Sequence, residues 1–195
     1  MNYLAHVYLS GDNEELIIGN YIADGLKGIK ASEFNSRIQR GISLHRHIDS
    51  FTDHHENVRT SKKRLVEKYG HYASVIVDVY YDHFLAKNWS DYSDEPLIDY
   101  EKRIYDLLLF NKMILPTNAM YFLNYMIDQK LLSNYARLQT ISNSLSGLSR
   151  RTKFKSNMEH AIEDLEEHYD LFEGDFNLFF PQLEVSVSEF LKDTE

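Results

Sequence analysis

Three stretches of the sequence each place two polar side chains four residues apart among apolar neighbours. The pairs are Asn20 and Asp24, His45 and Asp49, and Asp78 and Asp82. Residues i and i+4 lie on one face of a helix, so each stretch predicts a helix that presents two ligands together. Buried carboxylates are costly unless a metal ion or a partner charge compensates them. The spacing therefore predicts three helices that converge on a metal-dependent hydrolytic site.

Length and composition indicate one globular domain. The chain has 195 residues, 43% hydrophobic and 26% charged, and we predict a single domain over residues 1–195. It has no cysteine, so a metal ion needs His, Asp, Glu, Asn or water as ligands. No apolar run approaches the roughly 20 residues that span a bilayer, and the first residues lack a basic leader. We therefore expect a cytoplasmic protein without membrane contact.

Apolar residues recur at helical spacing through most of the chain, which only three prolines and eight glycines interrupt. This pattern predicts an all-α, single-domain multi-helix bundle. The β-branched run at 75–79 resembles a buried strand, but no nearby segment supplies a partner strand, so we expect a buried central helix there. The helices are predicted at residues 2–10, 14–27, 33–56, 58–69, 71–88, 96–112, 117–128, 131–148, 155–173 and 181–193.

The net charge of −9 argues against general nucleic-acid binding, because the phosphate backbone attracts basic surfaces. Basic side chains are nevertheless clustered at three places, one of which includes Arg46 and another Arg150 and Arg151. Such clusters either dock an acidic protein partner or are ordinary solvated helix faces.

One stripe of ligand-type residues runs along the third predicted helix. It contains His45, Asp49 and Asp53. A His with a carboxylate at i+4 can hold a divalent metal ion, and the neighbouring Arg46 can hold a phosphate oxygen. The same spacing also fits a surface His–Asp pair worth about 0.3–0.5 kcal/mol. Spacing alone leaves both interpretations open.

The predicted central helix carries Asp78 and Asp82 on one face, followed by His83 about 100° around the helix. These residues either serve a metal ion, or Asp82 simply holds His83 within the core. His6 lies in an apolar N-terminal segment, where a lone histidine is more often a satisfied core residue than a ligand. The sequence has no Gly-rich phosphate loop, GxSxG motif or Cys–His arrangement. What remains is a carboxylate and imidazole site suited to metal-activated attack on a phosphoester.

Five segments in fixed order resemble the bacterial acyl carrier protein phosphodiesterases, also called acyl carrier protein hydrolases. They are MNYLAH, GNYIAD, GISLHRHIDSFTD, DVYYDHFLAKNW and GLSRR. The resemblance runs from Met1 to about Tyr169 and is loose over residues 91–145. It implies a divergent, all-helical branch of the HD phosphohydrolase superfamily that depends on a divalent metal, chiefly Mn²⁺, with Mg²⁺ or Fe²⁺ as alternatives. Members of the family remove 4′-phosphopantetheine from holo-acyl carrier protein and leave the apo form.

Carried onto this sequence, the resemblance implies a set of site residues. The implied metal ligands are Asp24, His45, Asp49 and Asp82. The implied catalytic residues are His6, Asp24, His83 and Arg46, and the implied phosphate or substrate contacts are Asn20, Arg46, Arg150 and Arg151. Two alternatives stay open: an HD-type phosphohydrolase acting on a nucleotide or other small phosphoester, and a non-catalytic helical binding protein whose polar cluster is structural.

Overall fold

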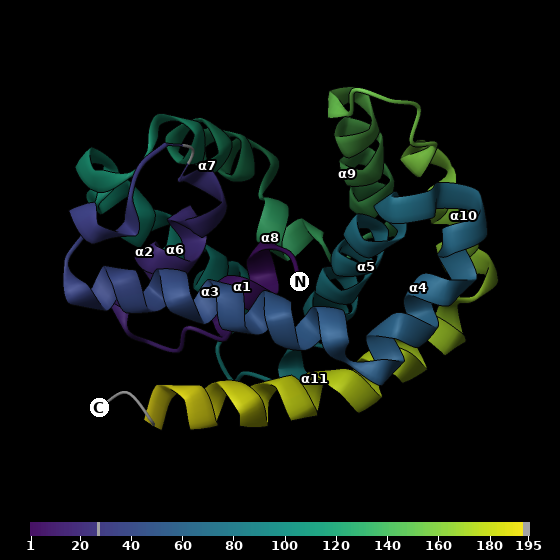
Figure 1. Cartoon of the computed structure of the whole chain (residues 1–195), viewed down its shortest axis with the longest axis horizontal. Coiled ribbons are helices and arrows are strands. Elements are labelled where there is room, and N and C mark those ends of the chain that lie inside the picture. Colours follow the sequence, from purple (N-terminus) through teal and green to yellow (C-terminus); the bar gives the residue numbers. More distant parts are fainter. Residues whose placement is uncertain (27, 193–195) are drawn as a thin grey trace.

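Helices follow one another along almost the whole chain, and the described residues, 1–26 and 28–192 of a computed structural model, contain no strand (Figure 1). The predicted all-α fold class is therefore confirmed. The α-helices are α1 (Tyr3–Tyr8), α2 (Glu14–Ile22), α3 (Ser36–His54), α4 (Glu56–Tyr69), α5 (Ala73–Lys87), α6 (Leu97–Phe110), α7 (Thr117–Gln129), α8 (Leu131–Asn134), α9 (Leu138–Arg151), α10 (Ala161–Glu167) and α11 (Tyr169–Lys192).

Helix α5 is the buried centre of the fold. Every residue from Val79 to Ala86 is buried, so the β-branched run before it belongs to a helix, as predicted. Helices α1, α4, α9 and α11 all pack against α5. Its second half is covered on all sides, and any polar side chain in that half must find its hydrogen-bond partners within the protein.

Helices α2 and α3 pack unusually closely because two glycines meet at their crossing. A Cβ atom built on Gly19 would lie 2.1 Å from the carbonyl oxygen of Ile38 and 2.8 Å from Cα of Gly41. Only a residue without a side chain fits at either position. Asn20 directly follows one of these glycines and His45 lies one turn after the other, so the crossing holds two of the polar stretches face to face.

Several predicted helix boundaries are wrong. The helix predicted at 14–27 ends at Ile22, and the helix predicted at 155–173 is divided between α10 and α11. The helix predicted at 131–148 is broken between α8 and α9, where the backbone carbonyl of Tyr135 bonds to Nδ1 of the buried His83 at 2.8 Å. The gap predicted before Pro181 does not exist, because α11 continues through this proline. The burial of four phenylalanines before Pro181 and of Leu183 and Val187 after it outweighs the single lost backbone hydrogen bond.

The predicted helix ends at residues 27 and 193 lie outside the described residues. Within the described ranges, no helix combines the length and the apolar character needed to cross a bilayer.

Candidate metal centre

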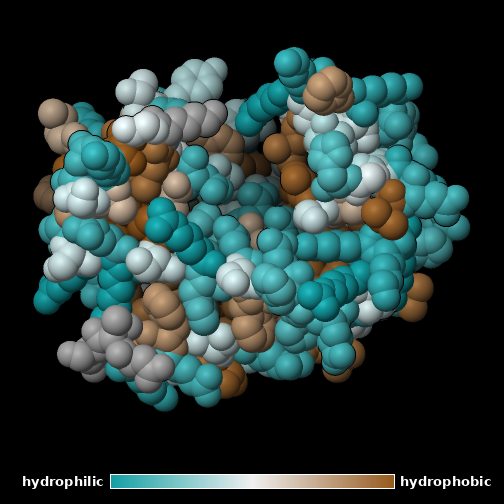
Figure 2. All heavy atoms as spheres, viewed as in Figure 1, coloured by the Kyte–Doolittle hydropathy of each residue, from teal (hydrophilic) through white to brown (hydrophobic). Residues whose placement is uncertain are grey.

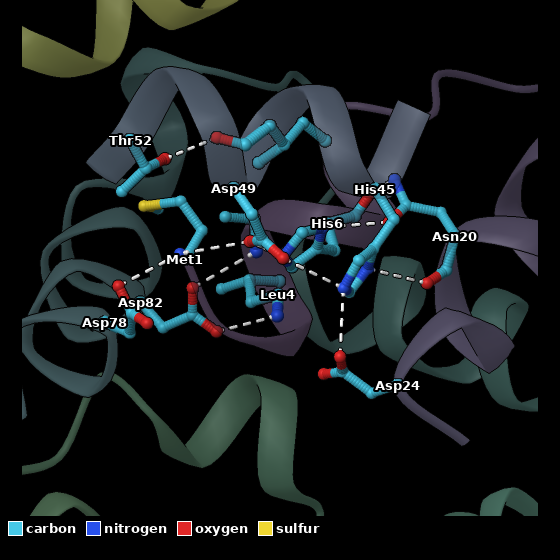
Figure 3. Close-up of polar contacts among 12 residues, drawn as sticks. Met1, Leu4, His6, Asn20, Asp24, His45, Asp49, Thr52, Asp78 and Asp82 are labelled. Carbon is cyan, nitrogen blue, oxygen red and sulfur yellow. Dashed lines mark hydrogen bonds and ion pairs between the residues drawn. The ribbon is translucent and has the colours of Figure 1, made fainter. Parts of the chain in front are cut away.

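Three side chains from α1 and α3 converge beside the α2–α3 crossing (Figure 3). His6, His45 and Asp49 each offer a ligand atom, and these atoms lie within 4.8 Å of one another. Nε2 of His6 lies 3.2 Å from Oδ1 of Asp49, and Nε2 of His45 lies 3.1 Å from Oδ2. The two imidazole rings stack with their centroids 4.0 Å apart. Both histidines are buried, whereas the Asp49 side chain is 43% exposed. The cluster is therefore at the protein surface on its Asp49 side.

Asn20 fixes the tautomer of both histidines. Its amide nitrogen donates to the carbonyl oxygen of His6 at 2.8 Å and to Oγ of Ser10 at 2.9 Å. Its Oδ1 must therefore accept from Nδ1 of His6 at 2.8 Å and from Nδ1 of His45 at 3.1 Å. With hydrogen on each Nδ1, both neutral rings direct an Nε2 lone pair toward Asp49.

The cluster brings two Nε2 atoms and the oxygens of Asp49 close together, and a positive charge is needed to stabilise these acceptors. Neutral Nε2 atoms and carboxylate oxygens repel one another at about 3 Å unless a proton or a metal ion lies between them. A void of about 20 Å³ borders His6, His45 and Asp24, enough for a water molecule or a small ion. Two imidazoles with oriented Nδ1–H groups and one carboxylate are a donor set that divalent transition metals accept. The cluster is consistent with a divalent metal site.

Asp24 follows α2 in a short 3₁₀ turn, η1 (Ala23–Gly25), and stands at the edge of this cluster. Its Oδ1 lies 3.1 Å from Nε2 of His45, and its side chain is 70% exposed. The hydrogen bond with His45 holds the pKa of Asp24 below its usual range. The second oxygen of Asp24 has no hydrogen-bond partner among the described residues, so this carboxylate can also contact a ligand from solvent.

The two histidines differ in pKa. Burial lowers the pKa of His6, and the hydrogen bond to Asp49 offsets this only in part. Burial also acts to lower the pKa of His45, but Asp24 and Asp49 outweigh it and raise the pKa to about 9. Burial opposes ionisation of Asp49, yet its bonds to the two histidines leave its pKa well below the usual range. Without a metal ion, His45 therefore carries the compensating proton at neutral pH.

Because His45 is protonated at neutral pH, we expect the metal affinity of the cluster to depend on pH. A metal ion that binds Nε2 of His45 must displace the proton, so affinity for Mn²⁺ should rise about tenfold per pH unit up to a pH of about 9 and level off above it, where His45 is neutral. Calorimetric titration in two buffers of different ionisation enthalpy should detect one proton released per ion near neutral pH. An affinity that is constant between about pH 6.5 and 8.5 would contradict this assignment.

The third polar pair does not join the cluster directly. Asp82 is fully buried, and its oxygens accept hydrogen bonds from the backbone N–H groups of Leu4 at 2.7 Å and Ala5 at 3.3 Å. Burial raises its pKa to about 7. Asp78 contacts the α-ammonium group of Met1 at 3.0 Å, and that group lies 3.8 Å from Asp49. Asp82 thus caps the start of α1 and holds the helix that carries His6.

The other sequence candidates lie at separate places. His83 is buried away from the cluster, with its ring nitrogens 2.8 Å from the carbonyl oxygen of Tyr135 and 2.7 Å from the Tyr169 hydroxyl. Arg46 and Arg150 are exposed. Asn20, predicted to contact phosphate, is only 1% exposed, and its amide is fully used in orienting the histidines.

Sequence reasoning missed a cavity of about 280 Å³ beside the cluster, which α5, α7 and α9 line together with residues 1–3. Asp24 and Arg151 both border it. Of the predicted arginines, Arg151 is therefore the one that the fold places at the same cavity as Asp24. No local signal marks this cavity, because its walls come from helices that are distant in sequence.

Comparison with known proteins identifies the family. A family model described as acyl carrier protein phosphodiesterase matches residues 1–183 of the chain. This chain is a member of the acyl carrier protein phosphodiesterase family. Proteins named acyl carrier protein phosphodiesterase from Serratia proteamaculans (strain 568) and Enterobacter sp. (strain 638) are each 30% identical to it. The first alignment covers 94% of this chain and 95% of the relative, and the second covers 96% and 97%.

A protein of the same name from Escherichia coli (strain K12 / DH10B) is 31% identical over 192 residues, covering 96% of this chain and 98% of the relative. The family resemblance seen in the sequence is thus confirmed along nearly the whole chain. No solved structure matches the chain, so the relation to HD-domain folds stays a prediction.

Proposed function

We propose that this chain is a phosphodiester hydrolase that converts holo-acyl carrier protein into apo-acyl carrier protein and 4′-phosphopantetheine. Its membership of the acyl carrier protein phosphodiesterase family over residues 1–183 carries this proposal. The His6–His45–Asp49 cluster supports it, because buried imidazoles with fixed tautomers beside a surface carboxylate suit hydrolysis of a phosphoester. A cytoplasmic location, as expected from the sequence, belongs to the same proposal.

The proposed cofactor is a divalent ion, with Mn²⁺ first and Mg²⁺ or Fe²⁺ as alternatives. His6, His45 and Asp49 would hold it, and Asp24 is placed to complete the set from the solvent side. When bound, such an ion supplies acidified water and neutralises negative charge at phosphorus. Asp82 is proposed as a positioning residue, because it binds the backbone of α1 rather than the cluster.

The remaining polar groups would act on the substrate phosphate and its protein. Arg151 borders the cavity beside Asp24 and is proposed to bind phosphate oxygens. Arg150, Lys153 and Lys155 are exposed around it and form a basic surface suited to an acidic carrier protein. Arg46 is exposed on α3 and is proposed to extend this attraction. His83 is proposed to position Tyr135, whose carbonyl it contacts.

The direct test is incubation of the purified protein with holo-acyl carrier protein and Mn²⁺, followed by intact-mass measurement of the carrier protein. We expect loss of the phosphopantetheine mass, and we expect a chelator to stop it. Activity on a nucleotide panel with none on the carrier protein would favour the alternative phosphohydrolase. A protein that binds no divalent ion and leaves the carrier protein unchanged would favour a non-catalytic binding protein.

A further inference from the structure

The cavity beside the cluster is open to solvent on the face drawn in Figure 2, where the surface is hollowed between α7 and α9. Its volume is about 280 Å³, near the lower end of the range for small-ligand sites. Met1, Asn2, Tyr3 and Asp24 border both this cavity and the small void next to His6 and His45. A ligand in the cavity would therefore reach the edge of the metal centre.

The cavity walls combine apolar and polar groups. Val79, Phe122 and Leu148 supply apolar surface from three different helices. Asn2, whose amide donates to the Tyr135 hydroxyl at 3.1 Å, and Ser144 supply hydrogen-bonding groups. Such walls suit a thin, flexible ligand in which amide groups alternate with short alkyl segments. They are less suited to a nucleoside triphosphate, which needs more than one cationic side chain, because Arg151 is the one lysine or arginine among the described residues that border the cavity.

We propose that this cavity binds the pantetheine arm of the substrate while the phosphodiester lies at the metal centre, an assignment that rests on the proposed function. The arm is a chain of two amides, a hydroxyl, a branched dimethyl carbon and a terminal thiol, and this mixture of polar and apolar groups matches the mixed lining of the cavity. Arg151 and Asp24 border the same cavity and would mark its phosphate end. The cavity would then select the phosphoester by binding its pantetheine arm, and the His6–His45–Asp49 cluster would catalyse its hydrolysis.

Helix α9 provides a sharp way to test this assignment. Ser144, Gly147, Leu148 and Arg151 share one face of the helix and line the cavity. A Cβ atom built on Gly147 meets only Nη2 of Arg150, at 3.9 Å. A larger side chain at this position would therefore occupy cavity space without clashing with the backbone of another helix.

The experiment compares the wild type with two filling variants, Gly147→Leu and Ser144→Leu, and with the control Gly174→Leu. Gly174 is an exposed helical glycine on α11 whose built Cβ atom meets nothing within 4 Å. The control repeats the same change of residue away from the cavity. Thermal melting checks that all four proteins fold, and replacement of a helical glycine should not lower stability.

Two measurements are made: the affinity for free pantetheine by calorimetry, and kcat/KM for release of apo-acyl carrier protein. We expect both filling variants to lose about tenfold or more in each, and the control to match the wild type. Folded filling variants that bind pantetheine and process the carrier protein like the wild type would overturn the assignment. A wild type that never cleaves the carrier protein would refute the proposed function instead. In that event, the pantetheine titrations alone still decide whether the cavity binds this ligand.

Discussion

Replacing Asp49 with asparagine is expected to reduce kcat/KM on holo-acyl carrier protein on the order of a thousandfold. The side chain bridges Nε2 of His6 and Nε2 of His45 with its two oxygens. An amide keeps the shape but removes the charge and one of the acceptors. A bound ion would contribute several kcal/mol of charge stabilisation at the transition state, and each ~1.4 kcal/mol is a factor of ten in rate.

The matched control for this change is Asp53→Asn, four residues further along α3. Asp53 is 63% exposed and pairs with Lys62 at 2.8 Å, away from both histidines. The control should keep the wild-type rate and bind the same amount of Mn²⁺, whereas Asp49→Asn should lose both. Metal content measured on folded protein separates loss of the ion from loss of the fold. An Asp49→Asn protein with wild-type metal content and rate would remove Asp49 from the centre.

Local spacing predicted which side chains share a helix face, because the i, i+4 relation depends only on helical geometry. His45 and Asp49 therefore appear together in the structure as the sequence indicates, 3.1 Å apart. Asn20 on α2 and Asp24 on η1 also share one side, and both side chains contact His45. For these four residues, the sequence predicts which side chains lie together within each segment. The contact between Gly19 and Gly41 then brings the two segments together.

The same spacing could not show what each pair would contact. Asp78 and Asp82 satisfy the pattern equally well. In the structure, however, the carboxylate of Asp82 binds backbone N–H groups in the first turn of α1 and does not join the His6–His45–Asp49 cluster. That difference depends on long-range packing, which a single helix does not encode. The role of Asn20 was missed for the same reason, since it follows from contacts with His6 and His45 on two other helices.

Gly19 lies at the α2–α3 crossing, and Gly19→Ala is expected to destabilise the protein by about 3 kcal/mol or more. Its new methyl group would fall 2.1 Å from the carbonyl oxygen of Ile38, a backbone atom that cannot rotate away. Overpacking of this kind forces the helices apart. Because Asn20 and Asp24 contact His45 across this crossing, the shift also moves the groups that orient this histidine.

A matched control is Gly174→Ala, the same change at an exposed position of α11 where the built Cβ atom meets nothing within 4 Å. This control should gain up to about 1 kcal/mol from helix propensity. Gly19→Ala should instead lower the melting temperature by roughly 6–12 °C for a chain of this size. Metal affinity, measured well below the melting temperature, should fall in Gly19→Ala and stay unchanged in the control. If both variants melt like the wild type and bind Mn²⁺ equally, the close helix crossing does not hold the centre together.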